Sequence, residues 1–202
     1  MTTMDMRRKS LSCGIDSKSS IAYSHLRKEK YMRLFLAISL EETMRQAILA
    51  LQEQWKSLGV RGHFVPSENL HLTLAFIGEY GNLDAVMDAM SDISFQPFAL
   101  QLDGAGNFHD TYWAGIAASD PLFSCVRRLR RALAEHGIPY DRKKFAPHVT
   151  LVRKAEFTGG METLLQHLPT GRMDVHEISL MRSDRGKNGM IYRRIGSIES
   201  GI

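Results

Sequence analysis

The sequence predicts an α+β fold made of two similar lobes, and three observations lead to this prediction. Runs with helical periodicity and runs with strand character follow one another over residues 32–202. The order of these runs over residues 32–117 is repeated in outline from residue 120 onward. A tetrapeptide of the form His-x-Thr-Leu occurs once in each half, at residues 71–74 and 148–151. We therefore expect each lobe to present one copy of this motif.

The first lobe begins with a strand and a helix. Residues 32–40 read M-R-L-F-L-A-I-S-L, which is typical of a buried strand. From Glu41 to Leu58, apolar residues recur at steps of three and four, which predicts an amphipathic helix. Gly59 follows directly and is expected to end it.

Three further helices and six further strands are expected along the chain. One helix covers Leu83–Met90 and another covers about Met161–Leu168. Between them, Asp120 is expected to cap a helix that has Pro121 in its first turn and ends at Gly137. The expected strands are Leu70–Ile77, Phe98–Leu102, Tyr112–Ala117, His148–Val152, Val175–Met181 and Met190–Ile195.

The charges are unevenly distributed and separate a tail from the folded part. Residues 1–31 hold 7 Lys and Arg against 3 Asp and Glu and have no apolar period, so we expect a disordered extension or tag. Residues 32–202 are expected to form a single bilobal domain. Within it, residues 32–125 carry 4 basic and 11 acidic side chains, whereas residues 126–202 carry 15 and 8. An anionic ligand would therefore favour the second half.

Composition excludes several classes of protein. The chain has 202 residues, 44% hydrophobic and 24% charged, as in an ordinary globular domain. No apolar run approaches the roughly 20 residues of a membrane span, so we expect a soluble protein without a membrane partner. Cys13 and Cys125 lie far apart and have no C-x-x-C partner, which favours a reducing, cytoplasmic setting.

The repeated tetrapeptide is the strongest indication of function. Composition alone gives on the order of 0.04 occurrences of H-x-T-L, so two copies by chance are improbable. Side chains alternate along a strand, so His71 and Thr73 share one face, as do His148 and Thr150. Facing lobes would place two imidazoles and two hydroxyls around one cleft. Such a cleft suits a phosphoryl group, with one imidazole as base, the other as acid, and the hydroxyls bound to the non-bridging oxygens.

The motifs have two other interpretations. A single histidine or threonine on a half-buried strand commonly has only a structural role, and it is the repeat that favours chemistry. Histidine is also a common metal ligand, but neither motif has an H-x-x-x-H, an H-E-x-x-H, or a cysteine or carboxylate at ligand spacing. We therefore expect neither a metal nor another cofactor.

At these residues the chain resembles the 2H phosphoesterase superfamily, and within it the bacterial and archaeal RNA 2′,3′-cyclic phosphodiesterases, first described as 2′-5′ RNA ligases. The resemblance covers Met32 to about Ile195. It rests on R-L-F-L-A-I, N-L-H-L-T-L-A-F-I-G, Trp113 followed by Gly115, F-A-P-H-V-T-L-V-R, and S-D-R-G-K-N-G-M-I-Y from residue 183.

The resemblance implies a bilobal α+β fold in which two antiparallel sheets face a central cleft and helices lie outside. It implies hydrolysis of an RNA-terminal 2′,3′-cyclic phosphate to a 2′-phosphate without a metal, with His71 as proton donor and His148 as proton acceptor. RNA with such an end, including tRNA fragments, is the implied partner, and we expect a monomer. The segment H-D-T-Y between Phe108 and Trp113 is shorter and less basic than the family pattern.

Further residues are candidates for substrate binding. Arg153 should share the face of Leu151, away from His148, and reaches a phosphate only if the strand ends or twists there. The candidates for stacking on a base are Phe76 and Phe145, for which core packing is the alternative. The candidates for contact with an RNA backbone are Arg142, Lys143 and Lys144, in the loop before the second motif.

Two questions stay open at the level of sequence. The arginines at positions 127, 128, 130 and 131 resemble an RNA footprint, but a solvated helix face is the simpler interpretation. The alternatives to cyclic phosphodiesterase activity are a 2′-5′ RNA ligase or phosphodiesterase that uses the same four residues, and a nucleotide- or RNA-binding module without turnover.

Overall fold

The computed structural model describes residues 31–187 and 189–201, and the extension expected over residues 1–31 lies outside this part except for Tyr31. The helices are α2 (Glu42–Ser57), α3 (Leu83–Ser91), α4 (Asp120–Glu135) and α5 (Met161–Leu164), and a 3-10 turn, η1, covers Ser67–Asn69. The strands are β1 (Met32–Ser39), β2 (Arg61–Phe64), β3 (His71–Tyr80), β4 (Phe98–Phe108), β5 (Thr111–Ile116), β6 (His148–Glu156), β7 (Arg172–Val175), β8 (Glu177–Gly186) and β9 (Gly189–Glu199).

The expected helices are present, with two corrections. Ser119, not Asp120, is the N-cap of α4, although it makes no side-chain capping bond, and Asp120 lies in the first turn. There its negative charge favours the positive end of the helix dipole. The fourth helix, α5, ends at Leu164, four residues before the expected Leu168.

The strands differ from the expected ones where pairing with a neighbouring strand, and not the hydrophobic pattern, determines where a strand begins and ends. Strand β2 was not expected, because its residues are mostly exposed; it is a strand only because it pairs with β6. Strand β4 continues six residues beyond Leu102, through a register shift that the segment D-G-A-G-N does not announce. The expected strand Val175–Met181 is divided at His176 into the end of β7 and the start of β8.

The strands form one strongly curled antiparallel sheet in the order β7-β4-β5-β6-β3-β1-β8-β9, with β2 on β6. The α+β class is therefore confirmed. The two expected sheets are the two halves of this sheet, because β3 and β6 meet at a single residue pair, Leu72 with Val149. We call β7-β4-β5-β6 with β2 the β6 half, and β3-β1-β8-β9 the β3 half.

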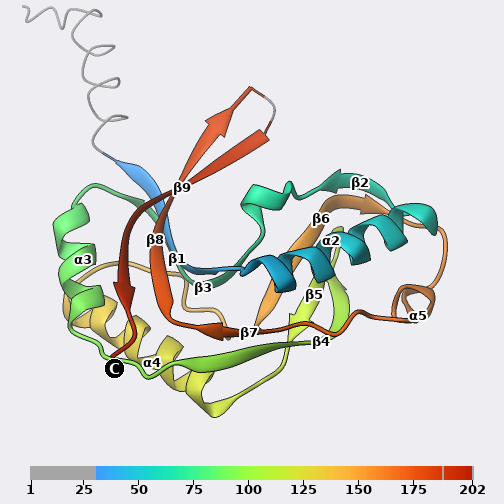
Figure 1. Cartoon of the computed structure of the whole chain (residues 1–202). Coiled ribbons are helices and arrows are strands. Elements are labelled where there is room, and N and C mark those ends of the chain that lie inside the picture. The colour runs from blue at the N-terminus through green and yellow to red at the C-terminus, as the bar shows by residue number, and fades with distance from the viewer. Residues whose placement is uncertain (1–30, 188, 202) are drawn as a thin grey trace, which may run out of the picture.

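The two halves of the sheet do not correspond to the two halves of the sequence. The β3 half takes β1 and β3 from the first part of the chain and β8 and β9 from the last. Helices are exchanged in the same way: α4 packs with α3 against the β3 half, whereas α2 packs against β6 and β7 (Figure 1). The expected lobes exist, but each one is assembled from both parts of the chain.

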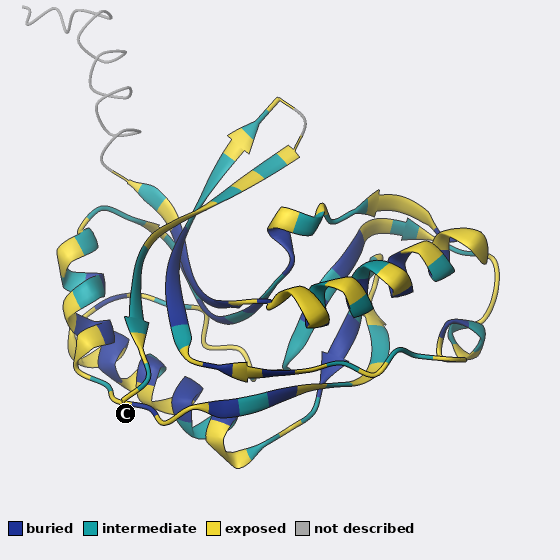
Figure 2. Ribbon diagram, in the orientation of Figure 1, coloured by how far each residue is buried: buried dark blue, intermediate teal, exposed yellow. Residues whose placement is uncertain are grey.

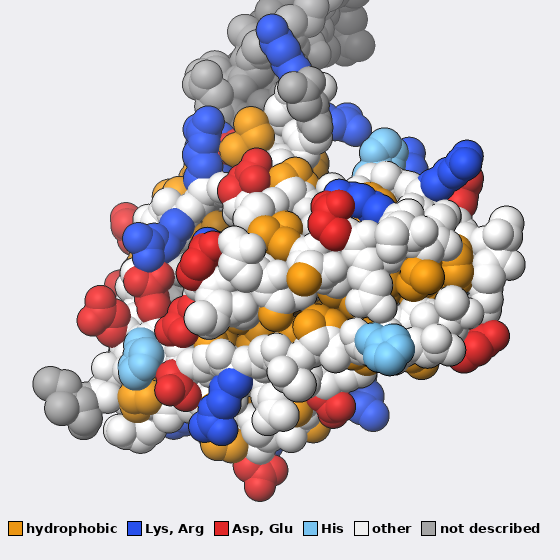
Figure 3. Space-filling model, turned by 45° about the vertical axis from the view of Figure 1, so that its right-hand side comes forward, with side chains coloured by type: hydrophobic (Ala, Val, Ile, Leu, Met, Phe, Trp, Pro, Cys, Tyr) orange, Lys and Arg blue, Asp and Glu red, His pale blue; other side chains and the backbone are white. Residues whose placement is uncertain are grey.

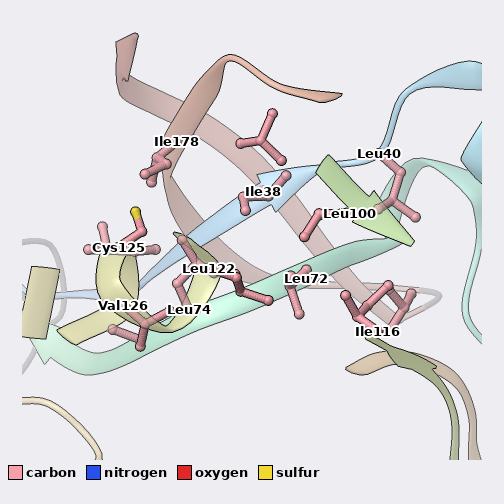
Figure 4. Packing of buried hydrophobic residues seen from close by; sticks show 14 of the residues in the cluster. Ile38, Leu40, Leu72, Leu74, Leu100, Ile116, Leu122, Cys125, Val126 and Ile178 are labelled. Carbon is pink, nitrogen blue, oxygen red and sulfur yellow. The ribbon is translucent and has the colours of Figure 1, made fainter. Parts of the chain in front are cut away.

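A continuous hydrophobic core fills the space between the helices and the sheet. In the close view of Figure 4, Leu72 and Leu74 of β3 lie between side chains of α4, such as Leu122, and of β4 and β5, such as Leu100 and Ile116. Figure 2 shows the same division along the helices, whose inner faces are buried and whose outer faces are exposed. Among the residues that the structure describes, no α-helix covers the opposite face of the sheet (Figure 1).

Cys125 of α4 belongs to this core and is completely buried. Burial raises the pKa of its thiol to about 11, so the thiolate is scarce at neutral pH. Cys13 lies outside the described residues. Across residues 31–187 and 189–201, no helix is both long and apolar enough to cross a membrane.

Candidate active site

The first motif begins β3, and its imidazole is fixed on both sides. His71 Nδ1 lies 2.7 Å from the carbonyl oxygen of Asn69, and its Nε2 lies 3.1 Å from Thr73 Oγ1. A carbonyl oxygen can only accept, so Nδ1 carries a proton and donates it. Asn69 is itself held, because its side-chain amide donates to the carbonyl of Met190 in β9 at 2.8 Å. Nε2 is left for chemistry, beside the threonine hydroxyl.

The second motif begins β6 and repeats the contact of Nδ1 with a backbone carbonyl. His148 Nδ1 lies 2.7 Å from the carbonyl oxygen of Ala146, which again is two residues upstream. The same argument assigns the proton to Nδ1 and leaves Nε2 for chemistry. Both histidines thus have one tautomer selected by the backbone that leads into their strand.

The β3–β6 pairing brings the motifs together. Leu72 is paired with Val149 in antiparallel register, and both side chains are fully buried. On either side of this single pair, the register of an antiparallel ladder would set His71 across from Thr150 and Thr73 across from His148. All four side chains are half-buried, whereas those of Leu72 and Val149 are buried. The expected alternation of polar and apolar faces therefore holds in both motifs.

The pKa of His71 reports on these surroundings. Burial lowers the pKa of His71 below its ordinary value, because the charged form is poorly solvated. The hydrogen bond to the Asn69 carbonyl acts in the opposite direction, and the positive charges of Arg153 and His148 lower the pKa further. Arg153 and His148 are therefore close enough to His71 to affect its charge.

Each histidine lies against two aromatic rings. The centroid of the His71 ring is 4.9 Å from that of Phe35 in β1 and 5.1 Å from that of Tyr192 in β9. The His148 ring lies 5.2 Å from Phe108 and 5.9 Å from Trp113. Sequence reasoning did not select Phe35, Phe108 or Tyr192. Their positions on the cleft face of neighbouring strands become apparent only once the strand order is known.

A cavity of about 300 Å³ opens beside His71. Thr73, Phe76 and Arg153 line it together with His71. The hairpin of β8 and β9 closes one side with Ser183, Met190 and Tyr192. The cavity thus combines a histidine, a hydroxyl and a guanidinium with aromatic surface, which suits a nucleoside phosphate.

Arg153 reaches this cavity because β6 has a bulge. Tyr112 is paired with Val152 and Trp113 with Thr150, so Leu151 has no partner on β5. The extra residue reverses the alternation: Leu151 and Val152 are both buried, and Arg153 turns to the face of His148. The expectation that Arg153 shares the face of Leu151 is therefore wrong for this reason.

An equivalent bulge in β3 turns Phe76 into the cavity. Leu36 is paired with Ala75 and Ala37 with Thr73, which leaves Leu74 without a partner on β1. Leu74 and Ala75 are both buried, and Phe76 lies on the cleft face. Phe76 and Arg153 are each five residues beyond a motif histidine, so they are equivalent positions of the two strands.

The remaining candidates lie away from this cavity. Phe145 packs against Phe123 of α4, with 5.5 Å between the ring centroids, and lines a different cavity beside α4, so the expectation that it stacks on a base at the histidines is not supported. Arg142 lies over Tyr140, and Lys143 is 3.4 Å from Asp141 with 87% of its side chain exposed. Lys144 is also exposed.

Charged side chains of both signs lie on one face of the molecule. On the face drawn in Figure 3, acidic and basic side chains are interspersed around hydrophobic ones. In the part of the chain that the structure describes, no three side chains of His, Cys, Asp or Glu gather in a way that could hold a metal ion.

The fold and the paired motifs define the class of the 2H phosphoesterases. Comparison with known proteins gives the family: the model of the 2′-5′ RNA ligase superfamily matches residues 34–187. The chain belongs to that superfamily.

Similar proteins carry names that describe an activity. A Methanothermobacter thermautotrophicus protein named RNA 2′,3′-cyclic phosphodiesterase is 31% identical, over 80% of this chain and 95% of its own length. A Methanocaldococcus jannaschii protein of the same name is 30% identical, over 81% and 98%. The crystal structure of Escherichia coli LigT without ligand matches with a TM-score of 0.70 and 26% identity, covering 85% of this chain and 98% of LigT. LigT has also been crystallised with 3′-AMP, and that structure matches with a TM-score of 0.67.

Proposed function

We propose that this protein hydrolyses RNA 2′,3′-cyclic phosphate ends to a 2′-phosphate by acid–base catalysis with two histidines and no metal. The observation that supports this most strongly is the β3–β6 pairing, which sets two imidazoles on one face, each with Nδ1 bound to a carbonyl, and with His71 Nε2 beside the Thr73 hydroxyl. The names of the M. thermautotrophicus and M. jannaschii relatives agree with this activity.

The proposed reaction moves one proton at each histidine. His148 Nε2 takes a proton from water as the water oxygen attacks phosphorus, and the phosphorus bond to the 3′ oxygen breaks. His71 Nε2 gives its proton to that departing oxygen, which becomes a 3′-hydroxyl. The phosphate remains on the 2′ oxygen, and solvent exchange restores both imidazoles. This order of acid and base follows the family resemblance.

Other side chains would bind the charged oxygens and the nucleoside. Thr73, Thr150 and Arg153 are proposed to donate to the non-bridging oxygens, where hydrogen bonds to charge are strong. Phe76 lines the same cavity and offers a ring for the terminal base. Three basic residues in the loop before the second motif are exposed, and we propose that they contact the RNA backbone beyond the terminal nucleotide: Arg142, Lys143 and Lys144.

The lowered pKa of His71 means that its ring must gain a proton before it can act as the acid. Without substrate, burial and the charge of Arg153 both disfavour the protonated ring. A bound phosphate would place negative charge beside Nε2 and favour protonation. Substrate binding would thus help to prepare the acid.

The proposal also covers the oligomeric state, the place of action and the RNA substrates. We propose, as the sequence suggested, that the working unit is a monomer. We propose that this monomer acts in the cytoplasm on RNA, with tRNA fragments among its substrates.

Identification of the product tests the proposal. An oligoribonucleotide that ends in a 2′,3′-cyclic phosphate is incubated with the protein, and the new end is mapped with a phosphatase and by chromatography against standards. The expected end is a 2′-phosphate with a free 3′-hydroxyl. A 3′-phosphate would contradict the assignment of acid and base. Joining of a 5′-hydroxyl RNA in a 2′-5′ linkage, with no hydrolysis, would favour the ligase alternative, and binding without turnover would favour a binding module.

A further inference from the structure

The tenth residue after the start of α2 and the tenth after the start of α4 have equivalent contacts. Gln52 of α2 is 3% exposed, and its side-chain amide donates to the carbonyls of Leu151 and Val65, both at 3.0 Å. Gln52 therefore joins β6 to the segment that follows β2.

Arg130 of α4 makes the matching contacts in the other half of the sheet. Its Nη1 donates to the carbonyl of Lys143 at 2.9 Å, and its Nη2 lies 3.4 Å from the carbonyl of Leu74. The guanidinium carbon lies 6.0 Å from the ring centroid of Tyr140 and 5.7 Å from that of Phe145. Arg130 therefore is not simply part of a solvated helix face.

Two of these four carbonyls, those of Leu74 and Leu151, belong to the bulge residues. Leu74 and Leu151 are the residues without a partner on the neighbouring strand, and each bulge turns a side chain two positions later into the cleft. The chain that leads to each motif covers the strand of the other motif: Val65 N donates to Leu151 O at 2.8 Å, and Asp141 N donates to Phe76 O at 2.8 Å. A bulge is a conformation that needs such outside support, because the ladder is interrupted there.

We propose that Gln52 and Arg130 are a pair of positioning residues, each of which fixes the bulge in one motif strand so that Arg153 and Phe76, respectively, point into the cleft. The inference deepens the proposed function and rests on it. Neither residue reaches the cavity itself, so each would act through the strand that it holds.

Gln52→Met tests the first half of the pair, because it keeps the volume and removes both hydrogen bonds. Val65 N still satisfies the Leu151 carbonyl, so the protein is expected to fold. Gln54→Met is the matched control: Gln54 lies on the same helix and donates to the carbonyl of Gln166 at 2.9 Å, far along the chain from either motif. We expect Gln52→Met to lower kcat/KM for a cyclic-phosphate oligonucleotide about tenfold or more and to weaken binding of inorganic phosphate, and Gln54→Met to do neither.

Double-mutant cycles separate positioning from a general loss of stability. Gln52→Met should add little to the loss caused by Arg153→Ala, because the residue it positions is already gone, but it should combine additively with Phe76→Ala. Arg130→Lys should show the reverse pattern, with Arg131→Met as its control, since Arg131 binds Glu135 at the surface. Thermal unfolding of every variant is measured alongside.

The outcomes distinguish this inference from the function it rests on. If the unaltered protein neither hydrolyses the oligonucleotide nor binds phosphate, the proposed function fails. If it does both, and Gln52→Met and Arg130→Lys behave like their controls or combine additively with Arg153→Ala and Phe76→Ala alike, the positioning role is wrong. Should Gln52→Met not fold, the cycles of Arg130→Lys decide the question alone.

Discussion

His71 and His148 are each oriented by a carbonyl two residues earlier in the chain, that of Asn69 or of Ala146. The repeated tetrapeptide revealed both histidines, because a strand must place His and Thr on one face. It did not reveal the carbonyls, since the conformation of the chain before each strand depends on what it packs against. Three of the aromatic rings around the imidazoles were missed for the same reason: Phe35, Phe108 and Tyr192 come from β1, β4 and β9.

At the scale of the residue, the charge of Arg153 should be measurable at His71. Burial and then Arg153 lower the His71 pKa, so Arg153→Gln removes one of these causes and should move the pKa upward, toward 6.5. Titration of the imidazole by NMR measures this directly. His71 is the proposed acid, so the alkaline limb of kcat/KM against pH should report the His71 pKa and hence a pKa below 6.5. A His71 that titrates above 6.5, or is indifferent to Arg153→Gln, would contradict the geometry.

The threonines should matter less than the histidines. Thr73→Ala or Thr150→Ala removes one proposed hydrogen bond to a charged oxygen, worth about 1.5–3 kcal/mol, so we expect kcat/KM to fall roughly ten- to a hundredfold. Steady-state kinetics of both variants give the values. Thr→Ser at the same positions keeps the hydroxyl and should restore most of the activity. If Thr→Ser is as impaired as Thr→Ala, the hydroxyl is not what the site uses.

At the scale of the element, the close approach of β4 and β5 places a requirement on Gly115. Gly115 is paired with His148, and a Cβ at this position would lie 2.1 Å from the carbonyl oxygen of Asp103. That oxygen belongs to the irregular part of β4, between Leu102 and Ala105. The strands cannot stay in place if this residue has a side chain.

Gly115→Ala should therefore both destabilise the fold and disturb His148. Overpacking of this kind costs about 1–3 kcal/mol or more, so the thermal midpoint should fall by several degrees and kcat/KM should fall with it. Gly201→Ala is the control, because the nearest atom to its Cβ is a side-chain nitrogen of Gln96 at an ordinary 3.5 Å. Calorimetry compares the two. Equal unfolding midpoints for the two variants would mean that β4 can move away from Gly115 without loss of stability.

The elements also show where sequence reasoning stops. Hydrophobic periodicity predicted the bounds of α2, α3 and α4 closely, because an amphipathic helix shows its apolar stripe in the sequence itself. The bulges at Leu74 and Leu151 were not foreseen, since L-A and L-V look like ordinary strand. They depend on which strand lies alongside, and so sequence alone left two directions open for Arg153: the face of Leu151, or a turn back toward a phosphate. For Phe145 the alternative of core packing holds, because it packs against Phe123 of α4, a neighbour that sequence alone does not bring near it.

At the scale of the molecule, the two halves of the sheet are interleaved in the chain. The β3 half uses strands from the beginning and the end of the described residues, and α2 and α4 each cross to the half that holds the other motif. Neither half can be completed by a continuous piece of the sequence. We propose, as the sequence suggested, that residues 32–202 fold as one domain.

This interleaving predicts a single cooperative unfolding transition. The calorimetric and van't Hoff enthalpies of unfolding should therefore agree. Leu72→Ala in β3 and Val152→Ala in β6 should lower the same unfolding midpoint, because both side chains belong to one core. Removal of residues 1–31 should leave that midpoint and kcat/KM unchanged. Two transitions, one sensitive to each substitution, would show that the halves of the sheet are independent.

The measurement that tests the central claim most directly is hydrolysis of a cyclic-phosphate oligonucleotide by His71→Ala and His148→Ala, with and without EDTA. Each proton transfer contributes roughly 10²–10⁴-fold, so either variant should lose at least about a hundredfold in rate while its unfolding midpoint stays near that of the unaltered protein. EDTA should leave the unaltered protein fully active. Near-normal hydrolysis by either variant, or a loss in EDTA that zinc or manganese restores, would contradict a site in which two histidines move the protons without a metal.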